Sequence, residues 1–350
     1  MTTFPSSLPE QGLGPKASWF KQGRATLSKG LKQTSGPFQV VTGTGPKIIL
    51  PNRFADELKA NESLSFNEAF QKDFFHEYPG FEPLKQGLKD DSLIQETVRV
   101  KLTQSLGLIT DDLVDETTCS IHDSFGEDSQ WHSTSLKKKI GDVVARLSSR
   151  VFLGKDLCRN KRWLEIAKDY TIDAFIASRI LKLVPSYLRP IAHWFVPHCI
   201  RLRKEYHDAQ KLINPEIERR KERAQKALEA GRKPPKTADT IGWMYELARG
   251  REVDYVGAQL SLTLAAIHTT TDAITQAVLD LCANPSVVEP LRKEIIDVIG
   301  SEGWSKTALY KLRLMDSFLK ESQRVHPPAY SKSSHHPQVN IPPLSIFQPP

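Results

Sequence analysis

Two short groups of residues in this 350-residue chain have the types and spacing that chemistry requires. Thr269, Thr270 and Thr271 follow one another within a long apolar stretch, and Ala265 and Ala266 lie one turn earlier. In a helix, a Thr269 hydroxyl can donate to the carbonyl of Ala265, and such a bond tends to bend the helix. Small side chains and a hydroxyl beside a bend suit a site that holds dioxygen and delivers protons to it. The alternative is a buried run of Thr residues whose hydroxyls are satisfied within the helix.

The second group is Glu321 and Arg324, which are three positions apart near the end of a later helical pattern. Side chains at this spacing lie on one face of a helix and are close enough to pair. Taken alone, such a pair is usually an exposed ion pair that contributes little to stability. The surrounding residues, from Phe318 to Pro327, make the pair a more specific signal.

The elements that position these residues are mainly α-helical, after a small N-terminal β element. The runs Phe38–Thr42 and Lys47–Leu50 are rich in β-forming residues and are separated by Gly43-Thr44-Gly45-Pro46, which predicts a hairpin. Apolar residues at helical spacing predict a long central helix from Val253 to Ala283. The patterns predict further helices over Pro51–Lys59, Glu96–His122, Leu136–Leu153, Trp163–Leu183, a charged stretch that ends before Gly231, Val287–Ile299 closed by Gly300, and Thr307–Val325.

Together these motifs resemble those of the cytochromes P450, the haem-thiolate monooxygenases. The run Ala265–Thr270 is similar to the oxygen-activating helix of that family, with the pattern Ala/Gly-Gly-x-Asp/Glu-Thr-Thr, and Phe318–Pro327 is similar to its Glu-x-x-Arg helix. The resemblance implies an incomplete cytochrome P450 fold of the fungal secondary-metabolism type. Ala266 stands where the family usually has Gly, and His268 stands where it usually has an acid.

The resemblance also implies roles for individual residues. Thr269 would take part in oxygen activation, and His268 would relay protons, because histidine titrates near neutral pH. Trp131, Ala265 and Ala266 would line the haem pocket. Glu321 and Arg324 would form a structural pair.

One part of the family pattern does not occur in the sequence as printed. The iron ligand of the family is a Cys on a Gly-rich loop after the Glu-x-x-Arg helix, yet none of the 26 residues after Arg324 is Cys. We therefore assign no metal ligand, leave the binding of haem by this chain open, and expect the chain as printed not to carry out monooxygenation. The four cysteines have no C-x-x-C spacing and are expected to pack as small apolar residues: Cys119, Cys158, Cys199 and Cys282.

Three segments follow from these patterns. We expect residues 1–24 to be a disordered N-terminal extension, residues 25–328 to be the partial cytochrome P450 domain, and residues 329–350 to be a Pro-rich tail unlike the family. This reading treats the chain as truncated at both ends and without a membrane anchor. The family works at the endoplasmic reticulum membrane, whereas this chain is expected to be cytoplasmic or peripheral.

Composition and charge limit the partners. The chain is 39% hydrophobic and 25% charged, with a net charge of +7. Residues 201–236 hold 12 Lys or Arg against 6 Asp or Glu, which would suit nucleic acid or an anionic surface. Interleaved glutamates favour a solvated helix surface instead, so we expect no nucleic acid. The resemblance implies NADPH-cytochrome P450 reductase and a small apolar substrate, terpenoid or indole-derived. The alternatives are a non-catalytic remnant and a helical protein that binds apolar ligands or anionic surfaces.

Overall fold

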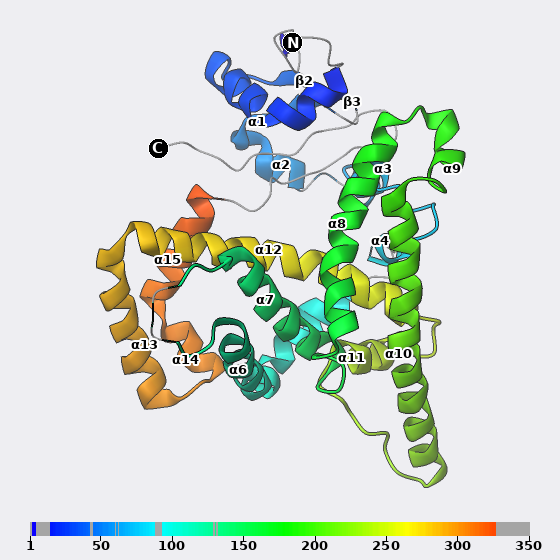
Figure 1. Ribbon diagram of the computed structural model, residues 1–350, viewed down its shortest axis with the longest axis vertical. Coiled ribbons are helices and arrows are strands. Elements are labelled where there is room, and N and C mark those ends of the chain that lie inside the picture. Colours follow the sequence, from blue (N-terminus) through cyan, green and yellow to red (C-terminus); the bar gives the residue numbers. More distant parts are fainter. Residues whose placement is uncertain are drawn as a thin grey trace. The chain divides into compact units, whose positions relative to one another are not determined.

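The computed structural model describes residues 2–4, 15–42, 45–59, 61, 63–87, 93–128, 130 and 132–326. The chain divides into two compact units (Figure 1). Unit 1 comprises Met1–Lys85, Asp173–Arg203 and Ala329–Pro350, and unit 2 comprises Gln86–Ile172 and Lys204–Pro328. The prediction for the tail over residues 329–350 lies outside the described residues.

Unit 1 begins with a three-stranded sheet covered by one helix. Strand β1 (Thr2–Phe4) pairs in parallel with β2 (Phe38–Thr42), which pairs antiparallel with β3 (Gly45–Ile49). The sequence predicted the β2–β3 hairpin, and the structure confirms it. Phe38, Val40 and Ile49 form a small core against Trp19 and Leu27 of helix α1 (Pro15–Gln33). Helix α1 crosses the boundary that the sequence predicted at residue 24.

The rest of unit 1 consists of short helices. The 3-10 helix η1 (Asn52–Phe54) and α2 (Ala55–Lys59) follow Pro51, where the sequence predicted a short helix. Two more helices, α3 (Phe66–Asp73) and α4 (Glu82–Gly87), begin after them. The C-terminal part of α8 (Lys161–Leu183), η3 (Ser186–Leu188), α9 (Arg189–Ala192) and the start of α10 (Pro197–Glu229) complete the unit.

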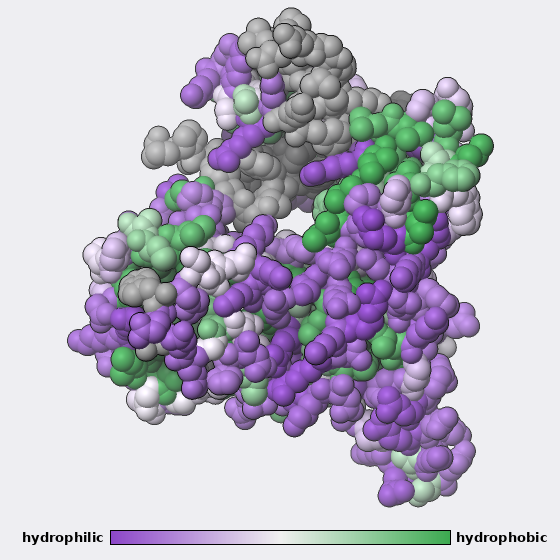
Figure 2. Space-filling model, viewed as in Figure 1, coloured by the Kyte–Doolittle hydropathy of each residue, from purple (hydrophilic) through white to green (hydrophobic). Residues whose placement is uncertain are grey.

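Unit 1 carries an exposed apolar patch around α9, which appears green in Figure 2. Its large side chains are exposed although the backbone beneath them is fixed: Leu183, Tyr187, Leu188, Ile191, Trp194, Phe195 and Ile200. The Arg189 guanidinium donates from Nε to the carbonyls of Leu181 and Val184, at 2.9 and 3.0 Å. The buried His193 ring stacks on Tyr78, with 4.6 Å between ring centroids. The patch is therefore a defined surface rather than a loose loop.

Unit 2 is built from helices joined by loops, and its described residues form no strand. Helix α5 (Leu93–Glu96) continues through the π-helical turn η2 (Thr97–Leu102) into α6 (Thr103–Phe125), and α7 (Leu136–Leu153) packs against both α6 and α12 (Tyr255–Ala283) (Figure 1). The N-terminal part of α8, the C-terminal part of α10 and α11 (Thr240–Ala248) follow in chain order. After α12 come η4 (Pro285–Val287), α13 (Val288–Glu302), α14 (Lys306–Lys311) and α15 (Arg313–Val325).

The structure confirms the mainly helical fold class and corrects two predicted helix ends. Helix α13 passes through Gly300 and ends at Glu302, before Gly303, whose φ of 67° lies in the left-handed region that glycine tolerates. The single helix predicted over Thr307–Val325 is two helices that meet at Leu312. The Glu294 carboxylate accepts the backbone N–H groups of Leu314 and Met315, at 2.7 and 2.9 Å, and so satisfies the new helix start.

No helix in the described part of the chain combines the length and apolar character that crossing a membrane requires.

Candidate functional site

Helix α12 carries most of the residues for which the sequence predicts chemistry, and its start is firmly fixed. The Asp254 carboxylate accepts the backbone N–H of Gly257 at 2.8 Å and the Tyr206 hydroxyl at 2.9 Å. One turn further on, the fully buried Gln259 side chain bonds to the Thr240 hydroxyl, which donates to the carbonyl of Phe152. A buried polar network of this kind holds a helix in one rotational setting.

Further along α12, small residues face solvent. Ala265 and Thr269 are exposed, and Ala266 is half-buried. The Thr269 hydroxyl donates to the carbonyl of Ala265 at 2.7 Å, which confirms the predicted bond to the preceding turn. The hydroxyl proton is therefore engaged in a hydrogen bond within the helix. The Thr269 oxygen can still accept a hydrogen bond from another donor. Methyl groups one turn away would let a flat ligand approach this side of the helix closely.

His268 takes part in a different contact. Its Nε2 lies 3.0 Å from the carbonyl oxygen of Lys168 in α8, and because a carbonyl only accepts, Nε2 carries the proton. The Lys168 ammonium in turn pairs with Asp142 of α7 at 2.5 Å. Adjacent residues in a helix point about 100° apart, and no bond joins the His268 ring to the Thr269 hydroxyl among the described residues. The proton relay from His268 stays a prediction, and in this arrangement the ring anchors α12 to α8.

Glu321 and Arg324 form the pair that the sequence predicted. Two parallel hydrogen bonds join them, from Nε and Nη2 of Arg324 to the two carboxylate oxygens of Glu321, both at 2.7 Å. The hydrogen bond from Arg324 lowers the pKa of Glu321. Both side chains are exposed on α15, so the pair is available to a further segment that would bind either charge.

A hydrogen bond between α12 and α15 was not predicted from the sequence. The Ser322 hydroxyl donates to the Asp280 carboxylate at 2.5 Å, and the amide of Gln276 donates to the same carboxylate at 2.9 Å. The Ser322 hydrogen bond is the main reason why the pKa of Asp280 is lowered. It ties the helix of Thr269 to the helix of Glu321 and Arg324. A small polar residue next to the Glu-x-x-Arg pair was the only sequence signal for this bond.

A buried charge cluster between α6 and α7 was also missed. Glu116 is only 2% exposed, and its oxygens lie 2.6 Å from Nη2 of Arg146 and 2.9 Å from Nη2 of Arg159. Arg146 extends the cluster to Asp123, at 2.6 Å. Burial raises the pKa of Glu116, but the hydrogen bonds and charges of the two arginines outweigh it, so the pKa is lowered.

The basic stretch of α10 is less solvated than the sequence predicted. Glu216 is buried, and it pairs with Arg219 at 3.0 Å, Arg220 at 2.7 Å and Arg223 at 3.3 Å. Arg220 is itself largely buried and pairs with Asp239 at 2.8 Å. The spacing of the glutamates did not indicate that Glu216 would be buried and would pair with three arginines.

The cysteines occupy helical or buried positions. Cys158 and Cys199 are buried, and burial raises the pKa of both thiols, to about 11 for Cys199. Cys119 is half-buried in α6, and Cys282 is exposed at the end of α12. No group of three or more His, Cys, Asp or Glu residues that could hold a metal occurs in the described ranges. Trp131, predicted to line a haem pocket, lies outside the described residues.

Comparison with known proteins gives consistent matches. The cytochrome P450 family model matches residues 96–341. The chain is 48% identical over 312 residues to cytochrome P450 monooxygenase bsc2 of Alternaria brassicicola, with 89% of this chain and 59% of the relative covered. It is 42% identical to cytochrome P450 monooxygenase 1 of Gibberella fujikuroi over 87% of this chain and 70% of the relative.

A third relative, cytochrome P450 monooxygenase adrA of Penicillium rubens, is 39% identical over 92% of this chain and 64% of its own length. The chain thus spans about three fifths of the length of the curated fungal relatives it matches first. The family model covers the helices that carry Thr269, Glu321 and Arg324, and identity to the relatives extends over most of the chain. This chain belongs to the cytochrome P450 family.

Proposed function

We propose that the protein containing this chain is a haem-dependent monooxygenase of fungal secondary metabolism that oxidises a small apolar substrate. Electrons would come from NADPH through cytochrome P450 reductase. The observation that supports this proposal is the solvent-facing side of α12, where Ala265 and Thr269 stand one turn apart in a chain of this family. When bound, haem supplies the binding and activation of dioxygen.

The described residues suit one face of a haem ring. Ala265 offers only a methyl group, and the Thr269 hydroxyl is already folded back onto its own helix, so neither side chain would obstruct a flat ring. Ala266 and, by the family resemblance, Trp131 would also line the haem pocket. The iron ligand of the family is a thiolate, whereas burial raises the pKa of the Cys158 and Cys199 thiols and so favours their protonated form. None of the four cysteines is proposed as the ligand.

In this proposal Thr269 accepts or passes a proton through its hydroxyl oxygen, beside the place where oxygen would bind. His268 holds a proton at Nε2 against the Lys168 carbonyl and would release it only when that contact opens. Glu321 and Arg324 would bind a neighbouring segment through their exposed charges.

The experiment compares Thr269→Ala with Thr269→Ser in the gene product that contains this chain, coexpressed with the reductase. Proton delivery by a positioned side chain contributes about 10²–10⁴-fold to a rate, so the alanine variant should form at least about tenfold less product per NADPH consumed. The serine variant keeps the hydroxyl and should retain most of the product. Because Thr269 is exposed, its removal should change stability by less than about 0.5 kcal/mol.

Reduction under carbon monoxide tests the cofactor. The gene product should show the Soret band of a thiolate-bound iron, and its absence from haem-reconstituted protein would contradict the proposal. The 350 residues expressed by themselves are the comparison. Since no cysteine follows Arg324 in them, they should give neither this band nor product.

A further inference from the structure

A proton relay through His268 would use both nitrogens of its ring. Nε2 donates to the carbonyl oxygen of Lys168 at 3.0 Å, so in the neutral ring Nδ1 carries no proton and can take one up. Protonation at Nδ1 leaves the Nε2 donor in place, and the contact with Lys168 is therefore kept in both charge states. Nδ1 itself bonds to none of the residues that the structure describes. His268 thus exchanges protons at Nδ1 and is held at Nε2.

The contact at Nε2 closes the route through the ring. An imidazole that relays protons takes one up at one nitrogen and releases another from the opposite nitrogen. Here the second proton would have to leave Nε2 toward a peptide carbonyl, which accepts hydrogen bonds but has no proton to exchange. In the reverse direction, the same carbonyl cannot donate to Nε2. In this arrangement the ring of His268 therefore carries no proton onward to Thr269.

His268 also lies on a side of α12 that contacts other helices. Asp272 is four residues further on and shares this side of the helix, and it pairs with Lys137 of α7 at 2.6 Å. Ala265 and Thr269 are likewise four residues apart, but both are exposed. Because adjacent residues in a helix point about 100° apart, the His268 ring faces neighbouring helices while the Thr269 hydroxyl lies on the solvent side.

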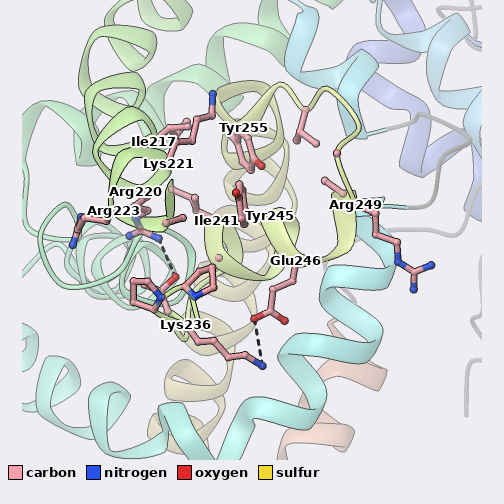
Figure 3. A pocket seen from close by; sticks show the side chains of 18 of the residues that line it. Ile217, Arg220, Lys221, Arg223, Lys236, Ile241, Tyr245, Glu246, Arg249 and Tyr255 are labelled. Atoms are coloured by element: carbon pink, nitrogen blue, oxygen red, sulfur yellow. Dashed lines mark hydrogen bonds and ion pairs between the residues drawn. The ribbon is translucent and has the colours of Figure 1, made fainter. Parts of the chain in front are cut away.

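Lys168 makes this contact a junction of three helices. Its carbonyl in α8 binds His268 of α12, and its ammonium group pairs with Asp142 of α7 at 2.5 Å. The first turn of α12 is fixed separately, where Tyr255 lies close to Tyr245 of α11 in the wall of a cavity (Figure 3). At about 1.5 Å per residue, Tyr255 is about 20 Å from His268 along the helix. The junction at Lys168 therefore holds the middle of α12.

We infer that His268 is a positioning residue and that the proton for Thr269 comes from water on the exposed side of α12. Through Nε2, His268 holds the middle of the helix against α8 and so fixes the place of the Thr269 hydroxyl. The role of Thr269 rests on the proposed function, whereas the contact between His268 and Lys168 is independent of it.

The 350-residue chain tests the contact without haem. When its histidines are isotope-labelled, nuclear magnetic resonance should show the neutral His268 ring protonated at Nε2, and the signal is identified by its loss in His268→Gln. Protonation of the neutral ring at Nδ1 instead would overturn the inference, because Nε2 could then not donate to the Lys168 carbonyl.

Two substitutions of equal shape separate the anchor from the titrating group. His268→Gln keeps an N–H donor near the position of Nε2 but does not titrate, whereas His268→Glu titrates but, when ionised, has no donor. In urea titrations of the 350-residue chain, the glutamate variant should unfold at a midpoint about 0.3–1 M below that of the glutamine variant. Equal midpoints would mean that the hydrogen bond to Lys168 does not hold α12.

The same two variants make opposite predictions for product formation in the gene product that contains this chain. As a positioning residue, His268 is replaced by glutamine with most of the product per NADPH retained, while glutamate forms about tenfold less because Thr269 is displaced. A relay predicts the reverse order, with a loss of about 10²-fold or more in the glutamine variant, and that order would overturn the inference. His207→Gln, at an exposed position of α10, is the control and should change neither quantity. If the original gene product forms no product, the proposed function is wrong, and the resonance and urea measurements still decide whether His268 holds α12.

Discussion

Glu116→Gln is expected to destabilise unit 2 because it removes the buried anion that pairs with both Arg146 and Arg159. Glu116 is 2% exposed, and Arg146 is 13% exposed. Breaking a buried pair by removing one charge costs about 3–5 kcal/mol, since the other charge stays buried. Arg159 is 52% exposed and can return to water, and Arg146 keeps Asp123. The expected loss is therefore at the low end of that range, about 3 kcal/mol.

Thermal unfolding followed by helical circular dichroism measures this loss. For a domain of 150–250 residues, 1 kcal/mol corresponds to about 2–4 °C, so the midpoint should fall by about 6–12 °C. Glu127→Gln is the control, because Glu127 is an exposed neighbour of the same cluster and should change the midpoint very little. A fall of less than about 2 °C in Glu116→Gln would refute the argument that Glu116 neutralises buried charge.

The same cluster gives a pH dependence with a definite sign. Because folding lowers the pKa of Glu116, the folded chain binds fewer protons there than the unfolded chain in mildly acidic solution. The stabilisation is complete above the unfolded pKa of about 4.3 and is lost as the pH falls through the lower pKa of the folded chain. Glu116→Gln should therefore differ most from the original chain at neutral pH and approach it in acid, and a difference that grows in acid would contradict this assignment.

Three further substitutions test other features. Arg249→Gly should raise the free energy of unfolding by about 1 kcal/mol, as measured by urea titration, because it relieves a left-handed backbone; a loss of stability would contradict this reading of the backbone. Gly30→Ala should destabilise unit 1, since a Cβ there would lie 2.3 Å from the Phe38 ring. Its control, Gly141→Ala, meets nothing closer than 3.6 Å and should stabilise α7 by about 0.5–1 kcal/mol; equal effects in thermal melts would refute the steric argument. Ser322→Ala removes a hydrogen bond to the Asp280 carboxylate and should cost about 1–2 kcal/mol in the same urea assay, whereas a neutral result would mean that α12 and α15 are held together by packing alone.

The features of the fold that could be predicted are those that depend on residues close together in the sequence. Helix α7 begins at Leu136 and ends at Leu153 as predicted, because an apolar period and a terminal Gly154 with φ 81° act within a few residues. The β2–β3 hairpin is equally local. The bond from Thr269 to Ala265 was also predictable, since its geometry depends on one turn of helix.

The unpredicted part depends on residues far apart in the chain. Glu116 meets Arg146 and Arg159 across 30 and 43 positions, and no spacing rule within one helix indicates such a contact. The start of α15 at Arg313 likewise depends on Glu294, which belongs to another helix. His268 was predicted to act in chemistry from its neighbours in sequence, whereas its partner, the Lys168 carbonyl, lies 100 positions away.

The exposed apolar patch around α9 has a consequence for the thermodynamics of unfolding. Heat capacity and denaturant sensitivity both increase with the apolar area that unfolding newly exposes to water. The side chains of Ile191, Trp194 and Phe195 are already exposed in the folded chain, so they add little to either quantity. Their exposure lowers the solubility of the native state instead, so replacing Ile191 and Phe195 with polar residues should leave the folding equilibrium nearly unchanged while it reduces the apolar surface of unit 1.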